Sequence, residues 1–344
     1  MAATPRELVY QTLNFEGPAR APRQLWVLPW AEQHYPEELA ALRRDFPDDI
    51  KGIGGHHRVL PKTAGDPHRI GTYTDEWGAT FHNIQDGVIG EVKDPLIKDW
   101  KTDVPKFHIP RELLSINRDA VSRDCAATDR FTMAGACPRP FEQLQFLRGT
   151  ENLYADLADP PAEMLSFLKT MHEFYCELLQ VWADTDVDAM MFMDDWGSQN
   201  ALLISPRLWR ELFKPLYRDY IQIAHSAGKK IFMHSDGHTL AIYPDMVELG
   251  LDAFNTQLFC MGVENLKPFA GKITFWGEID RQNLLPYGTL EDIEAAVRTV
   301  HANLWANGGC IAQCEFGAGA KPENVRRVFE MWDGLTQKHP PTGP

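Results

Sequence analysis

The sequence predicts an α/β protein, a (β/α)8 TIM barrel with elaborated N-terminal loops. From about residue 185 onward, short apolar runs that end in polar residues alternate with amphipathic helical stretches, which is the pattern of βα units with right-handed crossovers. The chain has 344 residues, an ordinary length for one barrel with insertions. We therefore expect a single domain over 1–344, with an N-terminal elaboration at about 20–125.

The predicted strands are short apolar runs bounded by glycine or charged residues. Each has four to six apolar-dominated residues, which suits a strand buried on both faces, as parallel strands are. The runs lie at 187–195, 229–236, 251–257, 272–280 and 309–315. Two weaker elements precede them, because 131–135 reads as a further barrel strand and 151–182 as a long helix or a helix pair.

The helices between these strands carry start and stop signals. Ser205 before Pro206 places a capping hydroxyl ahead of a proline at the first helical position, and Pro215 should kink or split the helix that follows. Thr289 with Asp292 forms a capping box for another helix. Lys321-Pro322 begins the last one.

Composition excludes several classes of function. The net charge is -14, from 48 acidic and 34 basic residues, and the basic residues form no dense cluster, so a nucleic-acid partner is not expected. The N-terminus lacks a signal-peptide core and the sequence has no apolar run of membrane-spanning length. Six scattered cysteines without a CxxC pair indicate reduced thiols. We expect a soluble, cytoplasmic protein.

Polar residues gather where the predicted strands end. In a (β/α)8 barrel these carboxyl ends line one mouth, which is where such barrels place their chemistry. A histidine, a cysteine and several carboxylates on neighbouring strands are the ligand types of a divalent metal. The residues expected there are Asp194, Asp195, His234, Asp236, Asn255, Gln257, Glu278, Asp280, Gln313, Cys314 and Glu315.

Each of these residues also has an ordinary structural interpretation. His234 directly follows an apolar triplet and is the strongest metal-ligand candidate, and the alternative is a buried histidine satisfied by a carboxylate. Cys314 is the next candidate, and a lone buried thiol is more often a small apolar residue. Asp194 and Asp195 are expected to hydrogen-bond substrate or a metal ligand. Gln257 and three tryptophans are expected to contact substrate, the latter being Trp77, Trp196 and Trp276.

The segments MFMDDWGSQNALLISPRLWRELFKPLYRDYIQIAHSAGKKIFMHSDG, ITFWGEIDRQNLLPYGTLEDI and KPENVRRVFE together resemble the uroporphyrinogen decarboxylase superfamily. The resemblance covers about residues 185–335 and is thinner upstream. It implies a (β/α)8 barrel. The superfamily contains tetrapyrrole decarboxylases and zinc-dependent methyltransferases that exchange methyl groups with corrinoid cofactors, so either activity is open.

The resemblance is closer to the methyltransferases than to the true decarboxylases. The decarboxylases carry an N-terminal Arg-Gln-Ala-Gly-Arg stretch that grips substrate carboxylates, whereas this chain has apolar and aromatic residues after Arg23-Gln24. In the methyltransferases a His-x-Cys pair and a later cysteine bind zinc. His234 matches the histidine, Asp236 stands at the first cysteine, and Cys314 matches the second. Glu278 is a further candidate ligand.

This resemblance implies zinc-dependent methyl transfer between a small methylated substrate, methoxy or methylamine-like, and a corrinoid cofactor or thiol acceptor. Asp194, Asp195 and Asp236 would be the catalytic carboxylates. No cobalamin-binding Asp-x-His-x-x-Gly signature occurs in the chain, so a corrinoid would arrive free or on a partner protein, and a homodimer is possible from the resemblance. Two alternatives remain: a metal-independent decarboxylase or lyase acting on a tetrapyrrole or other carboxylated molecule, and a non-catalytic barrel that binds a ligand or a corrinoid protein.

Overall fold

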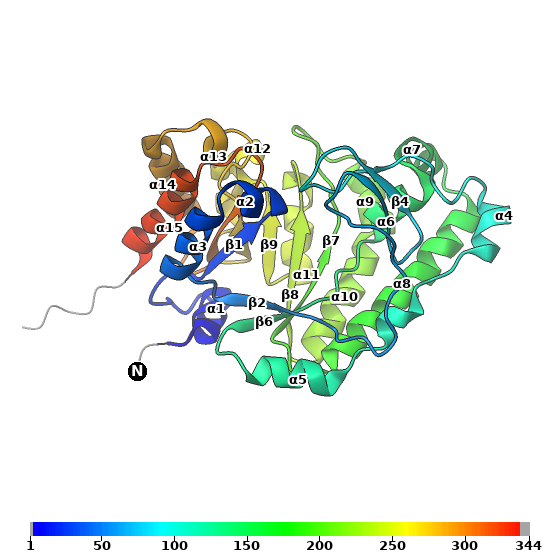
Figure 1. The fold of residues 1–344 in the computed structure, drawn as a ribbon, viewed down its shortest axis with the longest axis horizontal. Coiled ribbons are helices and arrows are strands. Elements are labelled where there is room, and N and C mark those ends of the chain that lie inside the picture. The colour runs from blue at the N-terminus through cyan, green and yellow to red at the C-terminus, as the bar shows by residue number, and fades with distance from the viewer. Residues whose placement is uncertain (1–2, 338–344) are drawn as a thin grey trace, which may run out of the picture.

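The chain folds as a (β/α)8 barrel whose eight strands form one sheet in the order β1-β11-β10-β9-β8-β7-β6-β2. The computed structural model describes residues 3–337. All neighbouring strands of this sheet pair in parallel. Helices pack around the sheet, with α14 and α15 on one side and α8 and α10 on the other (Figure 1). The carboxyl ends of the strands therefore open on a common mouth.

The barrel strands are β1 (Arg23–Val27), β2 (Ile50–Ile53), β6 (Phe131–Ala134), β7 (Ala189–Met193), β8 (Lys230–Ser235), β9 (Ala253–Thr256), β10 (Thr274–Gly277) and β11 (Cys310–Phe316). The longer helices are α1 (Pro5–Leu13), α3 (Pro36–Asp45), α5 (Arg118–Ala126), α6 (Pro140–Arg148), α7 (Thr150–Ala158), α8 (Ala162–Ala183), α9 (Pro206–Leu212), α10 (Lys214–Ser226), α11 (Tyr243–Leu249), α14 (Leu290–Leu304) and α15 (Pro322–Thr336). Short helical turns at the mouth are α2 (Pro29–His34), α12 (Leu258–Met261) and α13 (Leu284–Tyr287).

The elements predicted after residue 125 are confirmed. The five apolar runs are β7 to β11, and the weaker run at 131–135 is β6. The segment 151–182 falls in the helix pair α7 and α8, and the helix after Ser205 splits into α9 and α10 next to Pro215. The Thr289–Asp292 capping box is formed at the start of α14.

The N-terminal segment contributes more to the barrel than its sequence indicates. The stretch 20–125, treated above as an elaboration, supplies β1 and β2. It also forms a separate antiparallel sheet of β3 (Gly71–Thr74), β4 (Thr80–Asn83) and β5 (Glu91–Val92). Each of these strands has five residues or fewer, which is too short for a periodic hydrophobic pattern to stand out among the surrounding polar residues.

Side chains along each barrel strand alternate between two separate cores. One set faces the barrel axis and forms an inner core that includes Phe131, Phe232, Trp276 and Ile311. The neighbouring residues face outward and join a larger core beneath the helices. Because successive side chains of a strand point to opposite faces, the same alternation decides which strand-end residues reach the mouth.

The seam between β1 and β2 is closed by aspartates. Among the described residues these two strands form no ladder with each other. The Asp49 amide donates to the Arg23 carbonyl at 2.9 Å, and the Asp49 carboxylate accepts from the Arg23 amide at 2.7 Å. The Asp48 carboxylate accepts from the Leu25 amide at 2.7 Å. Two side chains therefore take the place of ladder hydrogen bonds at this edge.

Within residues 3–337, no helix combines the length and the apolar composition that crossing a membrane requires.

The Asp48 seam should make stability depend on pH. Burial raises the pKa of Asp48 to about 6, above the value of about 4 for an unfolded aspartate. The folded chain thus holds more protons between pH 4 and 6, so this residue's contribution to stability falls as pH rises through that window. Asp48→Asn keeps an acceptor for Leu25 and should be more stable than the parent by about 2 kcal/mol at pH 7, with no gain at pH 4.

Urea unfolding at both pH values measures this effect, with exposed Asp159→Asn as the matched control. An equal gain for Asp48→Asn at pH 4 and pH 7 would contradict the assignment.

Candidate functional site

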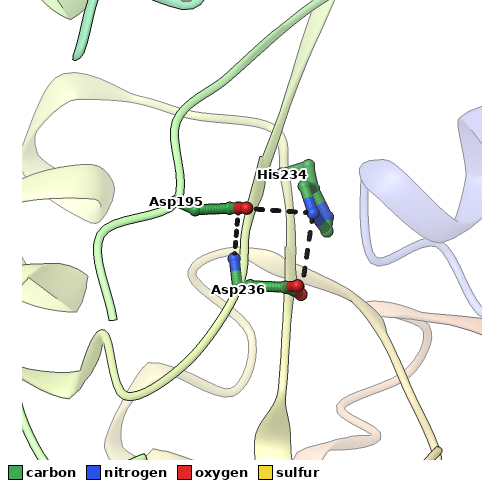
Figure 2. Close-up of side chains that lie close together, drawn as sticks. All are labelled: Asp195, His234 and Asp236. Atoms are coloured by element: carbon green, nitrogen blue, oxygen red, sulfur yellow. Dashed lines mark hydrogen bonds and ion pairs between the residues drawn. The ribbon is translucent and has the colours of Figure 1, made fainter. Parts of the chain in front are cut away.

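Three side chains converge at the barrel mouth from the ends of β7 and β8. The His234 Nε2 atom lies 3.6 Å from an Asp195 oxygen and 3.7 Å from an Asp236 oxygen. One ligand atom from each of these residues falls within 4.8 Å of the others. Figure 2 shows both carboxylates directed at the same edge of the imidazole ring. This set, Asp195, His234 and Asp236, is called the mouth cluster below.

The orientation of His234 is fixed from the opposite edge of its ring. Its Nδ1 atom lies 2.6 Å from the Asn255 side-chain oxygen, and the Asn255 amide nitrogen donates to the Trp276 carbonyl. Since that amide nitrogen is used as a donor, the Asn255 oxygen accepts and Nδ1 carries the hydrogen. In neutral His234 the unprotonated Nε2 atom therefore faces the two carboxylates, and a proton or a metal ion between them would satisfy its lone pair.

Asp236 divides its two oxygens between two roles. One oxygen accepts a charge-assisted hydrogen bond from Arg281. The other, Oδ1, is the oxygen that faces His234, and it is buried without a hydrogen-bond partner. A buried carboxylate oxygen without a donor is costly. This atom is therefore available to a metal ion or a ligand at the mouth.

Backbone packing holds the two aspartates at this spacing. The Asp236 amide donates to an Asp195 oxygen at 2.9 Å, and the Gly197 amide donates to the Asp236 carbonyl at 3.0 Å. Gly237 has φ +77, and a Cβ there would lie 2.1 Å from the Gly197 carbonyl oxygen. Only glycine permits both this conformation and this approach. The glycine that follows the strand-end aspartate thus lets the β7 and β8 loops touch.

Arg281 joins the mouth cluster to two further carboxylates. It lies 3.3 Å from Glu278 and 3.0 Å from Glu315, besides its bond to Asp236. Burial raises the pKa of Glu278 to about 8, so this side chain holds a proton at neutral pH. Burial also raises the pKa of Asp195, against the opposing charge of His234. The arginine is the cation that allows this many acids at one mouth.

A cavity of about 150 Å³ opens beside Arg281. Gln257, Glu278 and Arg281 line it, with Cys260 and Gln282 at its edge. Gln257 also accepts from the Gly237 amide at 3.2 Å. Two of the residues predicted from strand ends, Gln257 and Glu278, thus meet at one cavity next to the mouth cluster.

Asp194 lies on the opposite face of β7 from Asp195. Its carboxylate accepts from the Glu142 amide at 2.8 Å and from the Tyr217 hydroxyl at 2.6 Å. Burial raises its pKa to about 7. Of the two consecutive aspartates, the structure brings only Asp195 into the mouth cluster, because alternation turns Asp194 toward the helices.

The three tryptophans lie in three different places. Trp196 is fully buried beneath the helices, where it stacks on Phe141 at 4.1 Å between ring centroids. Trp276 lies inside the barrel and donates to the Gln24 side chain at 2.7 Å. Trp77 lines a second cavity, which also contains Arg139. None of the three contacts His234 among the described ring pairs, whereas Trp26 does, at 5.3 Å between centroids.

Cys314 is placed outside the mouth cluster. Its neighbours on β11, Gln313 and Glu315, share the inward face with Ile311, whereas Cys314 belongs to the outer core and is fully buried. Burial raises the pKa of its thiol, which opposes the thiolate that a metal requires. The predicted His234 and Cys314 pair is not brought together, because odd and even positions of β11 face opposite ways.

Sequence reasoning missed Arg281, Asn255 as an orienting residue, and Trp26. Arg281 follows Glu278 by three residues at the end of β10, a spacing that could have indicated an ion pair. The contact between Asn255 and His234 spans two strands. That contact follows from strand register, which a single sequence does not reveal.

Removal of the Arg281 charge should destabilise the mouth. In Arg281→Gln the acids Asp236, Glu278 and Glu315 lose their shared cation, and we expect a loss of about 3 kcal/mol at pH 7.5. The loss should shrink at pH 5, because protonation of the unpaired acids removes their repulsion.

Urea unfolding at the two pH values tests this expectation. Exposed Arg218→Gln, which removes a surface ion pair, should cost less than about 1 kcal/mol at either pH. A loss for Arg281→Gln that is independent of pH would show that the arginine acts through packing alone.

One of the solved structures that this chain resembles shares its fold over nearly the whole chain. A methyltransferase from Methanosarcina mazei matches with a TM-score of 0.64 and 14% identity, over 97% of this chain and 99% of that one. A 3-keto-D-glucoside 4-epimerase from E. coli matches with a TM-score of 0.40 and 14% identity, over 64% and 86%. At these identities the likeness is one of fold alone. No curated protein matches the sequence.

The family is given by the sequence itself. The model of the uroporphyrinogen decarboxylase (URO-D) family matches residues 70–335, which is about three quarters of the chain. The matched region contains the mouth cluster, Arg281 and the strands β6 to β11. The chain therefore belongs to the uroporphyrinogen decarboxylase family.

Proposed function

We propose that this protein is a zinc-dependent methyltransferase, which moves a methyl group between a small methylated substrate and a corrinoid cofactor or thiol acceptor. The observation that carries the proposal is the His234 Nε2 atom, which faces two carboxylate oxygens at 3.6 and 3.7 Å. The Methanosarcina mazei methyltransferase, which spans the same barrel, supports this choice among the activities of the family.

The donor set fits a divalent metal. One imidazole nitrogen and two carboxylate oxygens are a chemically sensible zinc set that leaves a position open for substrate. Asn255 holds the imidazole in the tautomer a metal requires, as second-shell partners of metal ligands do. The unpartnered Oδ1 of Asp236 gains a partner if a cation binds. We therefore assign Asp195, His234 and Asp236 as ligands in place of the His234 and Cys314 pair.

Bound zinc would polarise a methoxy or amine group, or lower the pKa of a thiol. The surrounding residues supply the remaining needs of the reaction. Glu278 holds a proton at neutral pH and is placed at the cavity to protonate an oxygen or nitrogen that has lost its methyl group. Trp26, beside His234, excludes water from one side. Arg281 keeps the Asp236 carboxylate in position.

Decarboxylation of a tetrapyrrole is disfavoured by the charges at the mouth. A ligand with many carboxylates needs several arginines that are free to bind it, yet Arg281 is already paired with Asp236, Glu278 and Glu315. Arg23, the residue matching the family's N-terminal arginines, forms an ion pair with Asp333 instead. A metal-independent lyase acting on another substrate and a non-catalytic barrel are the remaining alternatives. In the proposed transferase, a corrinoid would arrive free or on a partner protein.

Metal content tests the assignment. The purified protein should carry about one zinc per chain, which His234→Ala and Asp236→Ala should lose, since each removes one of three ligands. Cys314→Ser is the matched control and should keep its zinc, because Cys314 lies in the outer core. Inductively coupled plasma mass spectrometry measures zinc, and circular dichroism checks that the variants fold.

Retention of metal by folded His234→Ala would refute the ligand set, and loss in Cys314→Ser would restore the cysteine as a ligand. Absence of metal after reconstitution would move the assignment to a metal-independent lyase. Activity is then measured by conversion of cob(I)alamin to methylcobalamin with methoxy and methylamine compounds. Metal binding and substrate binding without turnover would favour the binding-protein alternative.

A further inference from the structure

A second cavity, of about 160 Å³, opens in another part of the molecule, and none of its lining residues belongs to the mouth cluster. It lies over the carboxyl end of β6, the neighbour in the sheet of β7, whose end carries Asp195. Gly135 and Ala136 form its floor, and α8 forms one wall through Tyr175 and Trp182. The cavity belongs to the barrel mouth, where this fold places its ligands.

Arg139 lies in this cavity without a counter-ion. Among residues 3–337 no carboxylate comes within ion-pair distance of its guanidinium, although Glu76 also lines the cavity. By contrast Arg148, at the C-terminal end of α6, is held by Asp156 at 2.7 Å. A half-buried guanidinium without an anion is costly, and it has five donors in a planar fork that matches a carboxylate.

The groups nearest to Arg139 do not neutralise it. Burial raises the pKa of the Cys137 thiol to about 12 and keeps the Tyr175 hydroxyl neutral by raising its pKa further. Burial raises the pKa of Glu142 to about 8, so this acid is mostly protonated at pH 7. The His57 Nδ1 atom at the cavity is buried and has no hydrogen-bond partner. The cavity thus offers a cation and an unused polar nitrogen to a ligand.

The rest of the lining is aromatic and apolar. Trp77, Tyr175 and Trp182 are all at most 4% exposed, and Leu178 lies between the last two along α8. Flat aromatic walls around one guanidinium suit a ligand with an aromatic body and a single anionic group.

We propose that the Arg139 cavity binds a small aromatic carboxylate, with its carboxylate on the guanidinium and its ring between the aromatic walls. The claim that this carboxylate is the substrate of the transferase rests on the function proposed above. The claim that the cavity binds such a ligand does not. Glu142 links the two places, because the charges of Arg139, Asp195 and Asp236 all act on its carboxyl group.

Isothermal titration calorimetry of the full chain with benzoate, and with benzamide as its uncharged analogue, tests the site. Benzoate should bind saturably and benzamide at least tenfold more weakly. Arg139→Met should weaken benzoate binding on the order of 30-fold, the loss of a charge-assisted pair. Arg139→Lys keeps the positive charge but loses the planar guanidinium, so its affinity for benzoate should lie between those of the parent and Arg139→Met. Exposed Arg123→Met on α5 is the matched control and should bind as the parent does.

Unchanged benzoate affinity in folded Arg139→Met, equal binding of benzamide, or no saturable benzoate binding would each overturn the proposal. The titration is repeated on His234→Ala, which should bind benzoate as tightly as the parent. If His234→Ala lost benzoate binding, the carboxylate would be bound by the metal rather than by Arg139, and this result would also overturn the proposal. A protein that binds benzoate through Arg139 but holds no zinc would refute the proposed function and leave this site standing.

Discussion

The alternation of side chains along the parallel strands is the constraint on which this site depends. Each strand turns every second residue toward the barrel axis. Asp195, His234 and Asp236 face the mouth for that reason, together with Glu278 directly after β10 and Glu315 on β11. Asp194, Ser235 and Cys314 alternate with these residues and face the helices, where the first two are hydrogen-bonded.

The acids next to the mouth cluster are balanced by Arg281. Asp195, Asp236, Glu278 and Glu315 converge within reach of Arg281 and His234. Such a group of acids is stable only if some hold protons or a cation enters. Burial raises the pKa of Glu278, so that this acid holds a proton. The proposed metal would be the cation. A mouth of this kind suits a positively charged or neutral reacting group.

A second region of the mouth has the opposite character. Around Arg139 the nearby thiol, hydroxyl and carboxyl groups are neutral by burial, and the walls are aromatic. The proposed metal-binding region is acidic, whereas the proposed ligand cavity is basic and aromatic. The β3–β5 sheet and the long N-terminal segment contribute to this end, since His57 and Trp77 lie within them.

The sequence by itself determined the barrel, the strands from residue 131 onward, and the strand ends that carry His234, Asp195 and Asp236. Those features depend on local hydrophobic patterns and on residue type. Tertiary structure alone decided that Asp236 rather than Cys314 joins His234, and that Asn255, Trp26 and Arg281 support it. These contacts depend on strand register and on which face each residue takes, and a one-residue shift would reverse them.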